Sequence, residues 1–339
     1  MRAALYYSNR DVRLVDLPVP EIQEDEILVR VRSSGICGSD VMEWYRKPKA
    51  PLVLGHEIGA EVVRVGSQVR SVRTGDRVFV SHHVPCGACA DCKAGHETVC
   101  DTLRTTTFDP GGFAEFVRVP AINVRLGTFR LPPEISDDEA VFIEPLACVV
   151  RGQRLARVHS GQVVLVIGSG IAGLLHIRLA RSRGAARVFA TDVVEFRKDA
   201  ARKVGADVVL DGREDVPARV RDGNAGRGAD VVITCTGAPS AIAQGLQSVN
   251  RGGTVLFFAP TDPTAKVSLP FNDLWREETT MTSSYGGAPR DIAEAIDLLR
   301  SKAVRVDDLI THRLPLREAQ EGFRLVSAAQ ESIKVILHP

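Results

Sequence analysis

The chain has 339 residues, more than one compact core usually supports, so its length predicts two domains. Its 43 basic and 42 acidic side chains leave a net charge of +1, which gives no reason to expect nucleic acid or an anionic membrane as a partner. No apolar run is long enough to span a membrane, and the first residues lack the features of a signal peptide, so we expect a cytoplasmic protein.

Residues 1–145 are predicted to be rich in β-strands. Alternating stretches such as 27–31 and 61–65 are separated by turn signals such as Gly75-Asp76 and the segment 109–112. This pattern of short strands and turns is typical of a compact β-domain.

Three segments of this region carry candidate ligands of a catalytic metal. Cys37 lies in Gly-Ile-Cys-Gly-Ser-Asp, His56 and Glu57 follow in Gly-His-Glu, and Glu144 lies in Ile-Glu-Pro-Leu. One thiolate with nitrogen and oxygen ligands suits a zinc ion that keeps a position open for substrate. Sequence spacing alone does not join these residues, because an isolated histidine is more often structural and an isolated glutamate more often solvated.

Four further cysteines crowd into the fifteen residues from Cys86 to Cys100, with the spacing C-x2-C-x2-C-x7-C. In a reducing compartment such crowding favours a metal over disulfides. Four thiolates make a closed tetrahedral site, so we predict a structural Zn²⁺ bound by Cys86, Cys89, Cys92 and Cys100. An iron–sulfur cluster or four unrelated thiols are the alternatives. His82 and His83, just before this lobe, are expected to be polar surface residues.

From residue 161 onward, apolar strands alternate with amphipathic helices. The continuous apolar run Val163–Ile167 is typical of a buried parallel strand, and residues 171–183 have helical spacing. Alternation of this kind predicts a parallel sheet covered on both faces. The remaining predicted elements are strands at 188–191, 208–210, 230–234, 254–258 and 334–337, and helices at 196–204, 290–300 and 316–327.

A dinucleotide site is predicted where the first of these strands meets the first helix. Gly168-Ser-Gly170-Ile171-Ala-Gly173 matches G-x-G-x-x-G, and Asp192 ends the next strand 19 residues after Gly173. The glycines let the backbone approach a pyrophosphate, and the helix N-terminus favours its charge. Asp192 can accept hydrogen bonds from a ribose and would repel a 2′-phosphate, which favours NAD over NADP. A glycine-rich turn without a ligand is the alternative.

In this order, the motifs resemble those of the zinc-containing medium-chain dehydrogenase family, over nearly the whole chain. Within it, the chain is most similar to the polyol branch of sorbitol and iditol dehydrogenases, with threonine dehydrogenases close by. The resemblance implies an α/β fold with a β-rich, GroES-like catalytic domain and a Rossmann NAD-binding domain with a doubly wound parallel sheet. The implied boundaries are 1–150 completed by 288–339, and 151–287. A homodimer or homotetramer is also implied. The motifs are Cys37-Gly38-Ser39-Asp40, Gly55-His56-Glu57, Gly75-Asp76-Arg77-Val78, the cysteine lobe, Glu144-Pro145-Leu146 and the glycine fingerprint.

The resemblance also implies the reaction and the roles of individual residues. Zinc would act as a Lewis acid on a secondary alcohol of a polyol, sugar alcohol or cyclitol, and NAD⁺ would take the hydride to give a ketone. By the match, Cys37, His56 and Glu144 surround the catalytic zinc, Glu57 binds it directly or through water, and Ser39 accepts the substrate proton. Lys334 matches a contact to the cofactor pyrophosphate, and Arg197 a contact to the adenosine end.

Three positions depart from the family pattern. Met42 stands where a histidine commonly ends the proton relay, so protons leave either through the cofactor ribose to water, which we favour, or through Glu43. Only Tyr285 remains of an Arg-Tyr pair that sorbitol dehydrogenases carry, which makes sorbitol a doubtful substrate. Ala60 replaces a usual glycine.

Other functions remain open on the sequence. A threonine or aminocyclitol dehydrogenase would use the same zinc and NAD, and would need a carboxylate such as Glu43 or Glu144 for the substrate ammonium. A non-catalytic binding or structural protein on this fold and a zinc-free quinone or enone reductase are disfavoured by the intact ligand set.

Overall fold

The computed structural model describes residues 1–339, which form two compact units. One unit comprises Met1–Ala147 together with Gly287–Pro339, and the other comprises Cys148–Gly286. The chain thus builds most of the first unit, forms the whole second unit, and returns to the first with its last residues. Helix α6 (Ile143–Leu155) spans the point at which the chain passes from one unit to the other.

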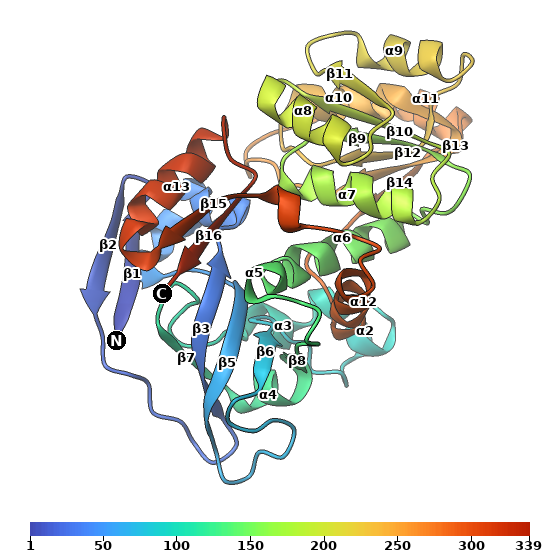
Figure 1. The fold of residues 1–339 in the computed structure, drawn as a ribbon. Helices are drawn as coiled ribbons and strands as arrows, with labels where there is room; N and C mark the ends of the chain where they lie inside the picture. Colours follow the sequence, from blue (N-terminus) through green and yellow to red (C-terminus); the bar gives the residue numbers. More distant parts are fainter. The chain divides into compact units, whose positions relative to one another are not determined.

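The first unit is built on a seven-stranded sheet (Figure 1). All its strand pairs are antiparallel except β15 with β16, which are parallel. The strands, in spatial order, are β15 (Ile310–Pro315), β16 (Lys334–His338), β3 (Ile27–Gly35), β5 (Glu57–Val65), β6 (Arg77–Val80) and β8 (Thr128–Arg130), and β7 (Phe116–Val119) pairs with β3 off this path.

The register of this sheet places the candidate metal ligands close together. Gly35, the last residue of β3, pairs with Glu57, the first residue of β5. Cys37 follows β3 by two residues and His56 precedes β5 by one, so both lie at this edge. The C-terminal strand β16 pairs with β3 at Ile336↔Gly35, which brings the end of the chain to the same place.

The core of the first unit follows from the period-two alternation of its strands. Val29, Val31, Ile58 and Val62 of β3 and β5 are buried in one hydrophobic cluster. A second cluster includes Tyr6, Phe113 and Phe323, in which the ring of Phe323 lies 5.4 Å from that of Tyr6 and 5.8 Å from that of Phe113, centroid to centroid. The remaining strands form a small sheet in the order β2 (Asp11–Asp16), β1 (Arg2–Ser8), β4 (Leu52–Val53).

Most helices of the first unit are short and lie in the connections between strands. Those of the N-terminal part are η1 (Gly38–Val41), α1 (Glu43–Arg46), η2 (Lys47–Lys49), α2 (Ala90–Lys93), η3 (Glu97–Val99), α3 (Asp101–Thr105), α4 (Ala121–Gly127) and α5 (Asp137–Ala140). Those of the C-terminal part are α12 (Pro289–Arg300), η4 (Asp307–Leu309), η5 (Leu316–Glu318) and α13 (Ala319–Ala328).

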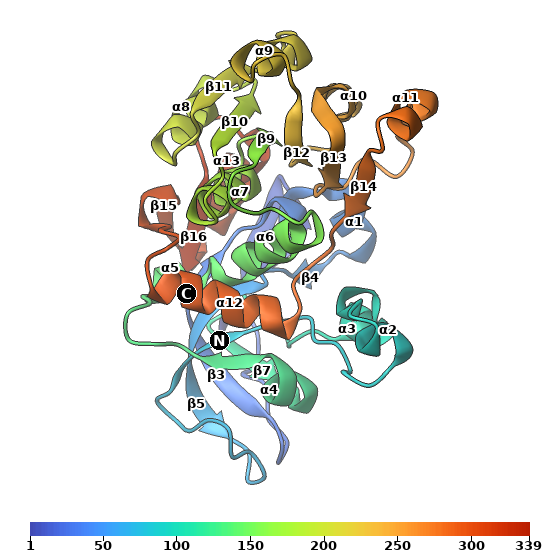
Figure 2. The same ribbon diagram turned by 90° about the vertical axis from the view of Figure 1, so that its right-hand side faces the viewer.

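The second unit contains a six-stranded sheet in which every neighbouring pair is parallel (Figure 2). The order of the strands reverses at β9, so the chain builds the sheet outward in both directions from this strand, as in a doubly wound fold. In spatial order the strands are β11 (Val208–Asp211), β10 (Arg187–Asp192), β9 (Val163–Ile167), β12 (Ala229–Thr234), β13 (Val249–Phe257) and β14 (Thr280–Ser283).

Helices connect these strands, and together with the sheet they confirm the predicted α/β fold class. Buried apolar side chains such as Leu165, Phe189 and Val232 fill the space under them. The sequence analysis did not predict α9, α10, α11 or the edge strand β14. The helices are α7 (Ile171–Ser182), α8 (Glu195–Lys203), α9 (Val216–Gly223), α10 (Pro239–Ser248) and α11 (Phe271–Arg276).

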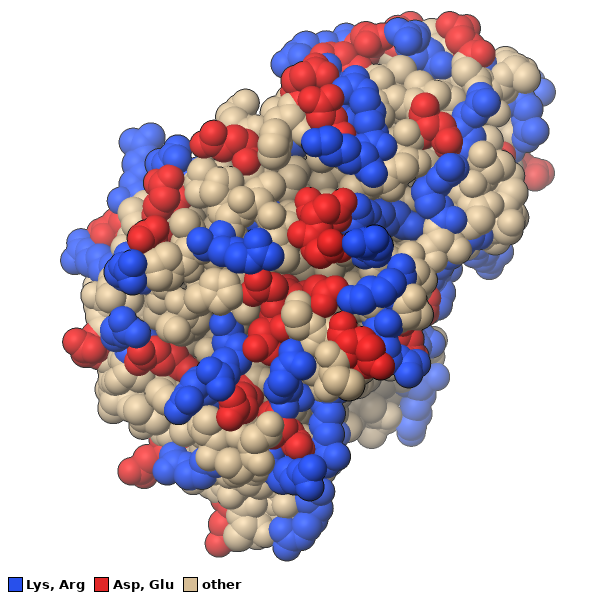
Figure 3. All heavy atoms as spheres, in the orientation of Figure 1, with Lys and Arg blue, Asp and Glu red and all other residues tan.

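Two further features are the distribution of charge on the surface and the length of the helices. Basic and acidic side chains are interspersed on the face seen in Figure 3, without a large area of one sign. None of the helices combines the length and the apolarity that crossing a membrane requires.

Candidate active site and metal centres

Cys37, His56 and Glu57 converge in the first unit. One potential ligand atom from each, the thiol sulfur, an imidazole nitrogen and a carboxylate oxygen, lies within 4.8 Å of the others. The convergence follows from the β3–β5 register, which sets the end of one strand against the start of the other. The three residues thus supply one soft and two harder ligands from two neighbouring segments, a donor set that suits zinc.

Glu57 forms a buried ion pair with Lys334, the first residue of β16. Both side chains are almost completely inaccessible. Gly35 leaves room for this pair, because a Cβ there would lie 2.4 Å from Glu57 Oε2 and 3.0 Å from Lys334 Cε and would displace them. The other oxygen, Oε1, is buried without a hydrogen-bond partner. A buried anionic oxygen that lacks a donor fits a site in which a cation completes its environment.

Lys334 has a partner within the protein that the sequence did not indicate. It was expected to contact a cofactor pyrophosphate, and the structure buries its ammonium against Glu57 in the first unit. The lysine neutralises part of the charge of the candidate metal site. Its contact with a cofactor stays a prediction.

Asp40 orients the imidazole of His56. Its Oδ1 lies 3.4 Å from His56 Nδ1, and its Oδ2 accepts a hydrogen bond from the backbone N–H of Cys37 at 3.0 Å. Burial alone would lower the pKa of His56, but the Asp40 carboxylate and the Cys37 thiol beside it hold that pKa well above its usual value. A carboxylate on one ring nitrogen fixes the other toward a metal, as in many zinc sites. The sequence analysis did not assign Asp40, although it lies three residues after the candidate ligand Cys37.

Ser39, the expected proton acceptor, lies in η1 and is held by Arg46. The guanidinium donates from Nη2 to Ser39 Oγ at 3.2 Å and from Nε to the Ser39 carbonyl oxygen at 3.0 Å. Arg46 is a second residue that the sequence analysis missed, because an arginine seven positions away gives no signal until the turn between η1 and α1 is known.

Glu43, the alternative end of the proton relay, is engaged away from Ser39. Its Oε1 accepts a hydrogen bond from the backbone N–H of Asn9 at 3.0 Å, and its Oε2 lies 3.6 Å from Lys47 Nζ. Met42 carries no group that could replace a histidine. Neither residue therefore offers a proton acceptor for Ser39 in this segment, and the route through the cofactor ribose to water stays a prediction.

His82 is partly buried and lies beside the candidate site. Its ring lies 4.8 Å from that of His56 and 3.8 Å from that of His83, centroid to centroid. Its Nδ1 is buried without a partner. Burial, with the positive charges of His56, Arg46 and Lys49, lowers the pKa of His83 to about 4. Both extra imidazoles are therefore neutral neighbours of the candidate site at neutral pH. The residues after β6 place them there, and no local pattern predicts in which direction that end of the strand turns.

Glu144 occupies the second position of α6 and is partly buried. It is not one of the three residues whose ligand atoms lie within 4.8 Å of one another. Its role as a further ligand stays a prediction from the resemblance.

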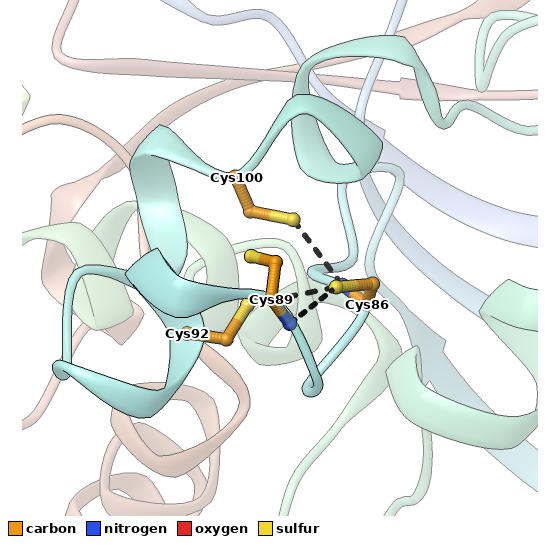
Figure 4. A group of neighbouring side chains, drawn as sticks. All are labelled: Cys86, Cys89, Cys92 and Cys100. Atoms are coloured by element: carbon orange, nitrogen blue, oxygen red, sulfur yellow. Dashed lines mark hydrogen bonds between the residues drawn. The ribbon is translucent and has the colours of Figure 1, made fainter.

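The four cysteines of the lobe gather around one centre, and their sulfur atoms turn toward each other (Figure 4). All four sulfurs lie within 4.8 Å of one another, with 4.0 Å between those of Cys86 and Cys92. Four thiolates bound tetrahedrally to zinc would be separated by about 3.8 Å. The short helices α2 and η3 bring the four together, so this group fits a closed metal site.

Backbone N–H groups of the lobe lower the pKa of two of the four thiols, Cys86 and Cys100. The N–H groups of Ala88 and Cys89 donate to Cys86 Sγ at 3.4 and 3.3 Å and lower the pKa of that thiol. Burial raises the pKa of Cys100, but N–H groups of Cys86 and Leu103 lower it to about 6. Burial and the neighbouring thiols raise the pKa of Cys92 to about 12. Four thiolates cannot coexist at this spacing without a cation, which a divalent metal would supply.

The glycine fingerprint forms the turn between β9 and α7 in the second unit. A Cβ at Gly173 would lie 1.9 Å from the carbonyl oxygen of Gly168, so only glycine permits this close approach. Gly170 caps α7 without a side-chain hydrogen bond, which leaves the N–H groups that follow it, from Ile171 onward, available. Such a helix start binds phosphate oxygens.

Asp192, the last residue of β10, holds this turn in place. Its Oδ2 accepts from the backbone N–H of Ser169 at 2.8 Å, and its Oδ1 accepts from the N–H groups of Val193 and Val194 at 2.8 and 2.9 Å. A carboxylate has about four acceptor positions, so room remains for one ribose hydroxyl. Asp192 is thus both a structural support of the turn and a candidate ribose contact.

Arg197, in the first turns of α8, lies beside the same turn. Its Nη1 is 3.9 Å from the position of a Cβ on Gly170, and its Nε is buried without a partner. A buried donor without an acceptor fits a residue that meets an anionic ligand. Its assignment to the adenosine end of a cofactor stays a prediction.

We expect Asp192→Ala to weaken selection for NAD. The substitution removes both the ribose acceptor and the charge that repels a 2′-phosphate, so the ratio of kcat/KM with NAD⁺ to that with NADP⁺ should fall by about 10-fold to 100-fold. Steady-state kinetics with the two cofactors measure this ratio. Asp199→Ala, which removes an exposed carboxylate paired with Arg202 on the same helix segment, is the control and should leave the ratio unchanged. An unchanged ratio in Asp192→Ala would exclude the ribose contact.

Comparison with known proteins connects both sites to one enzyme class. The family models "Alcohol dehydrogenase GroES-like domain" and "Zinc-binding dehydrogenase" match residues 23–127 and 172–301. The chain is 34% identical to an L-threonine 3-dehydrogenase of Caldanaerobacter subterraneus, over 98% of this chain and 97% of the relative. It is 30% identical to a sorbitol dehydrogenase of Bacillus subtilis, over 100% and 97%. Among solved structures, galactitol-1-phosphate dehydrogenase of Escherichia coli superimposes with a TM-score of 0.88 at 26% identity, covering 100% of both chains.

These matches confirm the resemblance, the zinc and NAD(H) cofactors and the enzyme class that the sequence predicted. The residues that converge in the first unit and the dinucleotide turn of the second are the two parts that such an enzyme needs. The chain belongs to the zinc-containing medium-chain dehydrogenase family and is a zinc- and NAD-dependent oxidoreductase that oxidises a secondary alcohol.

Proposed function

We propose that this enzyme oxidises one secondary hydroxyl of a polyol or a related small hydroxylated molecule, at a zinc ion held by Cys37, His56, Glu57 and Glu144. The observation that carries the proposal is the convergence of ligand atoms from Cys37, His56 and Glu57 within 4.8 Å. The orphaned Oε1 of Glu57 supports a cation at this place. A second zinc ion in the lobe would be structural, because its four thiols leave no position for substrate.

When bound, the zinc ion polarises the substrate hydroxyl, and the nicotinamide ring accepts the hydride. Side chains of the site would accept the substrate proton and hold the metal ligands in their orientation. Ser39 Oγ takes the hydroxyl proton, since Arg46 already fills one of its acceptor positions and fixes its orientation. Asp40 holds His56 in one orientation. Met42 carries no acceptor and Glu43 is engaged with Asn9 and Lys47, so the onward path from Ser39 would lead to water by way of the ribose of a bound cofactor.

We assign residues 1–150 and 288–339 to the catalytic domain and 151–287 to the NAD-binding domain. The two compact units support this assignment, with breaks after Ala147 and before Gly287. In the second domain, Gly168, Gly170, Ile171 and Gly173 would bind the pyrophosphate and Asp192 the adenosine ribose.

Threonine dehydrogenation is the competing activity, because several of the relatives are L-threonine 3-dehydrogenases. Its substrate ammonium needs a carboxylate in the pocket. Two carboxylates are candidates for binding this ammonium, Glu43 and Glu144. The Glu43 carboxylate already interacts with Asn9 and Lys47. The engagement of Glu43 removes one of the two candidate carboxylates, which supports substrates without an ammonium group.

The test is a screen of alcohols with NAD⁺, followed by NADH absorbance. Xylitol, sorbitol, an inositol and L-threonine are compared at equal concentration, with zinc content measured on the same preparation. We expect two zinc ions per chain and the largest kcat/KM with a polyol or cyclitol. A preference for threonine would support the competing activity, and full activity in a preparation without zinc at Cys37 and His56 would refute the proposed mechanism.

We also propose a homo-oligomer that works in the cytoplasm. The edge strand β14 and the neighbouring α11 expose large apolar side chains, with Phe271 70%, Trp275 69% and Met281 41% exposed. An unpaired parallel-sheet edge beside exposed aromatics favours pairing with a second copy. All seven cysteines are free, which suits a reducing compartment. Light scattering in solution would distinguish a dimer or tetramer from a monomer.

A further inference from the structure

The guanidinium of Arg46 lies against the hydroxyl that we assign to proton transfer. Nε donates to the Ser39 carbonyl oxygen at 3.0 Å, and Nη2 donates to Ser39 Oγ at 3.2 Å and to Asp40 Oδ1 at 3.3 Å. The side chain is 14% exposed, and Asp40 beside it is fully buried. These three contacts fix one edge of the cation in the candidate active site.

The other edge of Arg46 remains available to a ligand. Nη1 makes no hydrogen bond within the protein and is not among the buried atoms that lack a partner, so it reaches accessible space. The two N–H groups of Nη1 are held in the plane of a charged guanidinium, and such donors suit the oxygens of a carboxylate or phosphate. A substrate oxygen hydrogen-bonded to Ser39 Oγ would lie at most about 6 Å from Arg46 Nη2, which is the length of two hydrogen bonds placed end to end.

A second cation, Lys49, lies against the same tyrosine ring as Arg46. Lys49 Nζ lies 4.0 Å and Arg46 Cζ 4.6 Å from the centroid of the Tyr45 ring, so both cations border the same side chain. The carboxylate of Glu43 is engaged with Asn9 and Lys47, and that of Asp40 is enclosed by Arg46 and His56. No free carboxylate of this segment would oppose an anionic ligand at Nη1.

We propose that Arg46 is a specificity-determining residue that binds a carboxylate or phosphate group of the alcohol substrate, a few bonds from the carbon that is oxidised. The inference rests on the proposed function and narrows its substrate class to anionic secondary alcohols. Two N–H donors of a fixed cation favour such a group over a neutral hydroxyl, because charge-assisted hydrogen bonds are the stronger ones.

The test compares matched substrates that differ only by the anionic group. The pairs are 2-butanol with 3-hydroxybutyrate, and sorbitol with sorbitol 6-phosphate, each oxidised with NAD⁺ by the wild-type enzyme and by Arg46→Gln. For at least one pair, the wild type should prefer the anionic member, and Arg46→Gln should lower this preference by about 10-fold to 100-fold. The loss should appear mainly in KM for the anionic substrate. The first pair reports on a carboxylate and the second on a phosphate.

Lys47→Gln is the matched control, because it removes one positive charge from the same segment while Lys47 is exposed and paired only with Glu43. It should leave both preferences unchanged. Arg46→Lys, which keeps the charge but loses the fork, should recover part of the preference.

The outcomes separate the two proposals. An equal fall of kcat/KM for both members of each pair in Arg46→Gln would show that Arg46 only positions Ser39 and would overturn the inference. A wild-type preference for the neutral member of both pairs would also overturn it. Oxidation of none of the four alcohols, nor of any polyol, would instead refute the proposed function.

Discussion

Cys37→Ser is expected to remove one zinc ion per chain and to lower kcat/KM for alcohol oxidation by about 10³-fold or more. The thiolate is the only soft ligand in the group formed with His56 and Glu57. A bound metal contributes several kcal/mol to the stabilisation of developing negative charge, and each 1.4 kcal/mol corresponds to a factor of ten in rate. Zinc content by elemental analysis and NADH formation under steady-state conditions measure the two effects.

The control for this substitution is Cys235→Ala, which removes a thiol that belongs to neither metal group. It should keep both zinc ions. If Cys37→Ser retained two zinc ions and wild-type activity, the catalytic assignment of Cys37, His56 and Glu57 would be wrong. A fall in zinc with activity unchanged would show that the metal at this place has no part in the reaction.

Cys100→Ser is expected to lower the stability of the protein strongly and its activity only slightly, in contrast to Cys37→Ser. Cys100 is the buried member of the lobe, and without it the remaining three thiols no longer close a tetrahedral site. Zinc content should fall from two ions to one. A loss of about 3 kcal/mol in the free energy of unfolding corresponds to a decrease in Tm of roughly 6–12 °C for a unit of this size.

The activity of Cys100→Ser, measured well below its Tm, should stay within about fivefold of wild type, because a closed site takes no part in catalysis. Thermal unfolding by circular dichroism gives the Tm, and the comparison with Cys37→Ser assigns each zinc ion to one group. An unchanged Tm together with zinc loss would mean that the lobe does not depend on its metal. Complete inactivation at low temperature would argue against a purely structural role.

Local patterns in the sequence were sufficient to predict the fold class and the dinucleotide turn. The run Val163–Ile167 and the helix that begins at Ile171 agree with β9 and α7 of the structure. The fingerprint could be identified because the requirement at Gly173 depends on an atom only five residues away, the Gly168 carbonyl oxygen. Weaker amphipathic segments such as α9 and α10 were missed, since their signals are short and their formation depends on packing against the sheet.

Long-range contacts decided the surroundings that no local pattern predicted. The pairing of β16 with β3 brings Lys334 to Glu57, 277 positions away in the chain, while its contact with a cofactor phosphate stays a prediction. His82 was expected on the surface, and the end of β6 turns it toward His56. In both cases strand pairing decides which side chains meet, and no local pattern reports on it.

By itself, the sequence determined which chemical groups this protein carries and the short-range arrangements among them: four thiols within fifteen residues, a glycine turn followed by an acidic strand end, and strands that alternate with helices. Only the tertiary structure decided that Cys37, His56 and Glu57 meet, that Asp40 and Arg46 hold the neighbouring side chains, and that one edge of Arg46 stays open. The reason is physical: a local arrangement is fixed by the few torsion angles between its members, whereas contacts between distant segments depend on strand register and on the packing of the whole core.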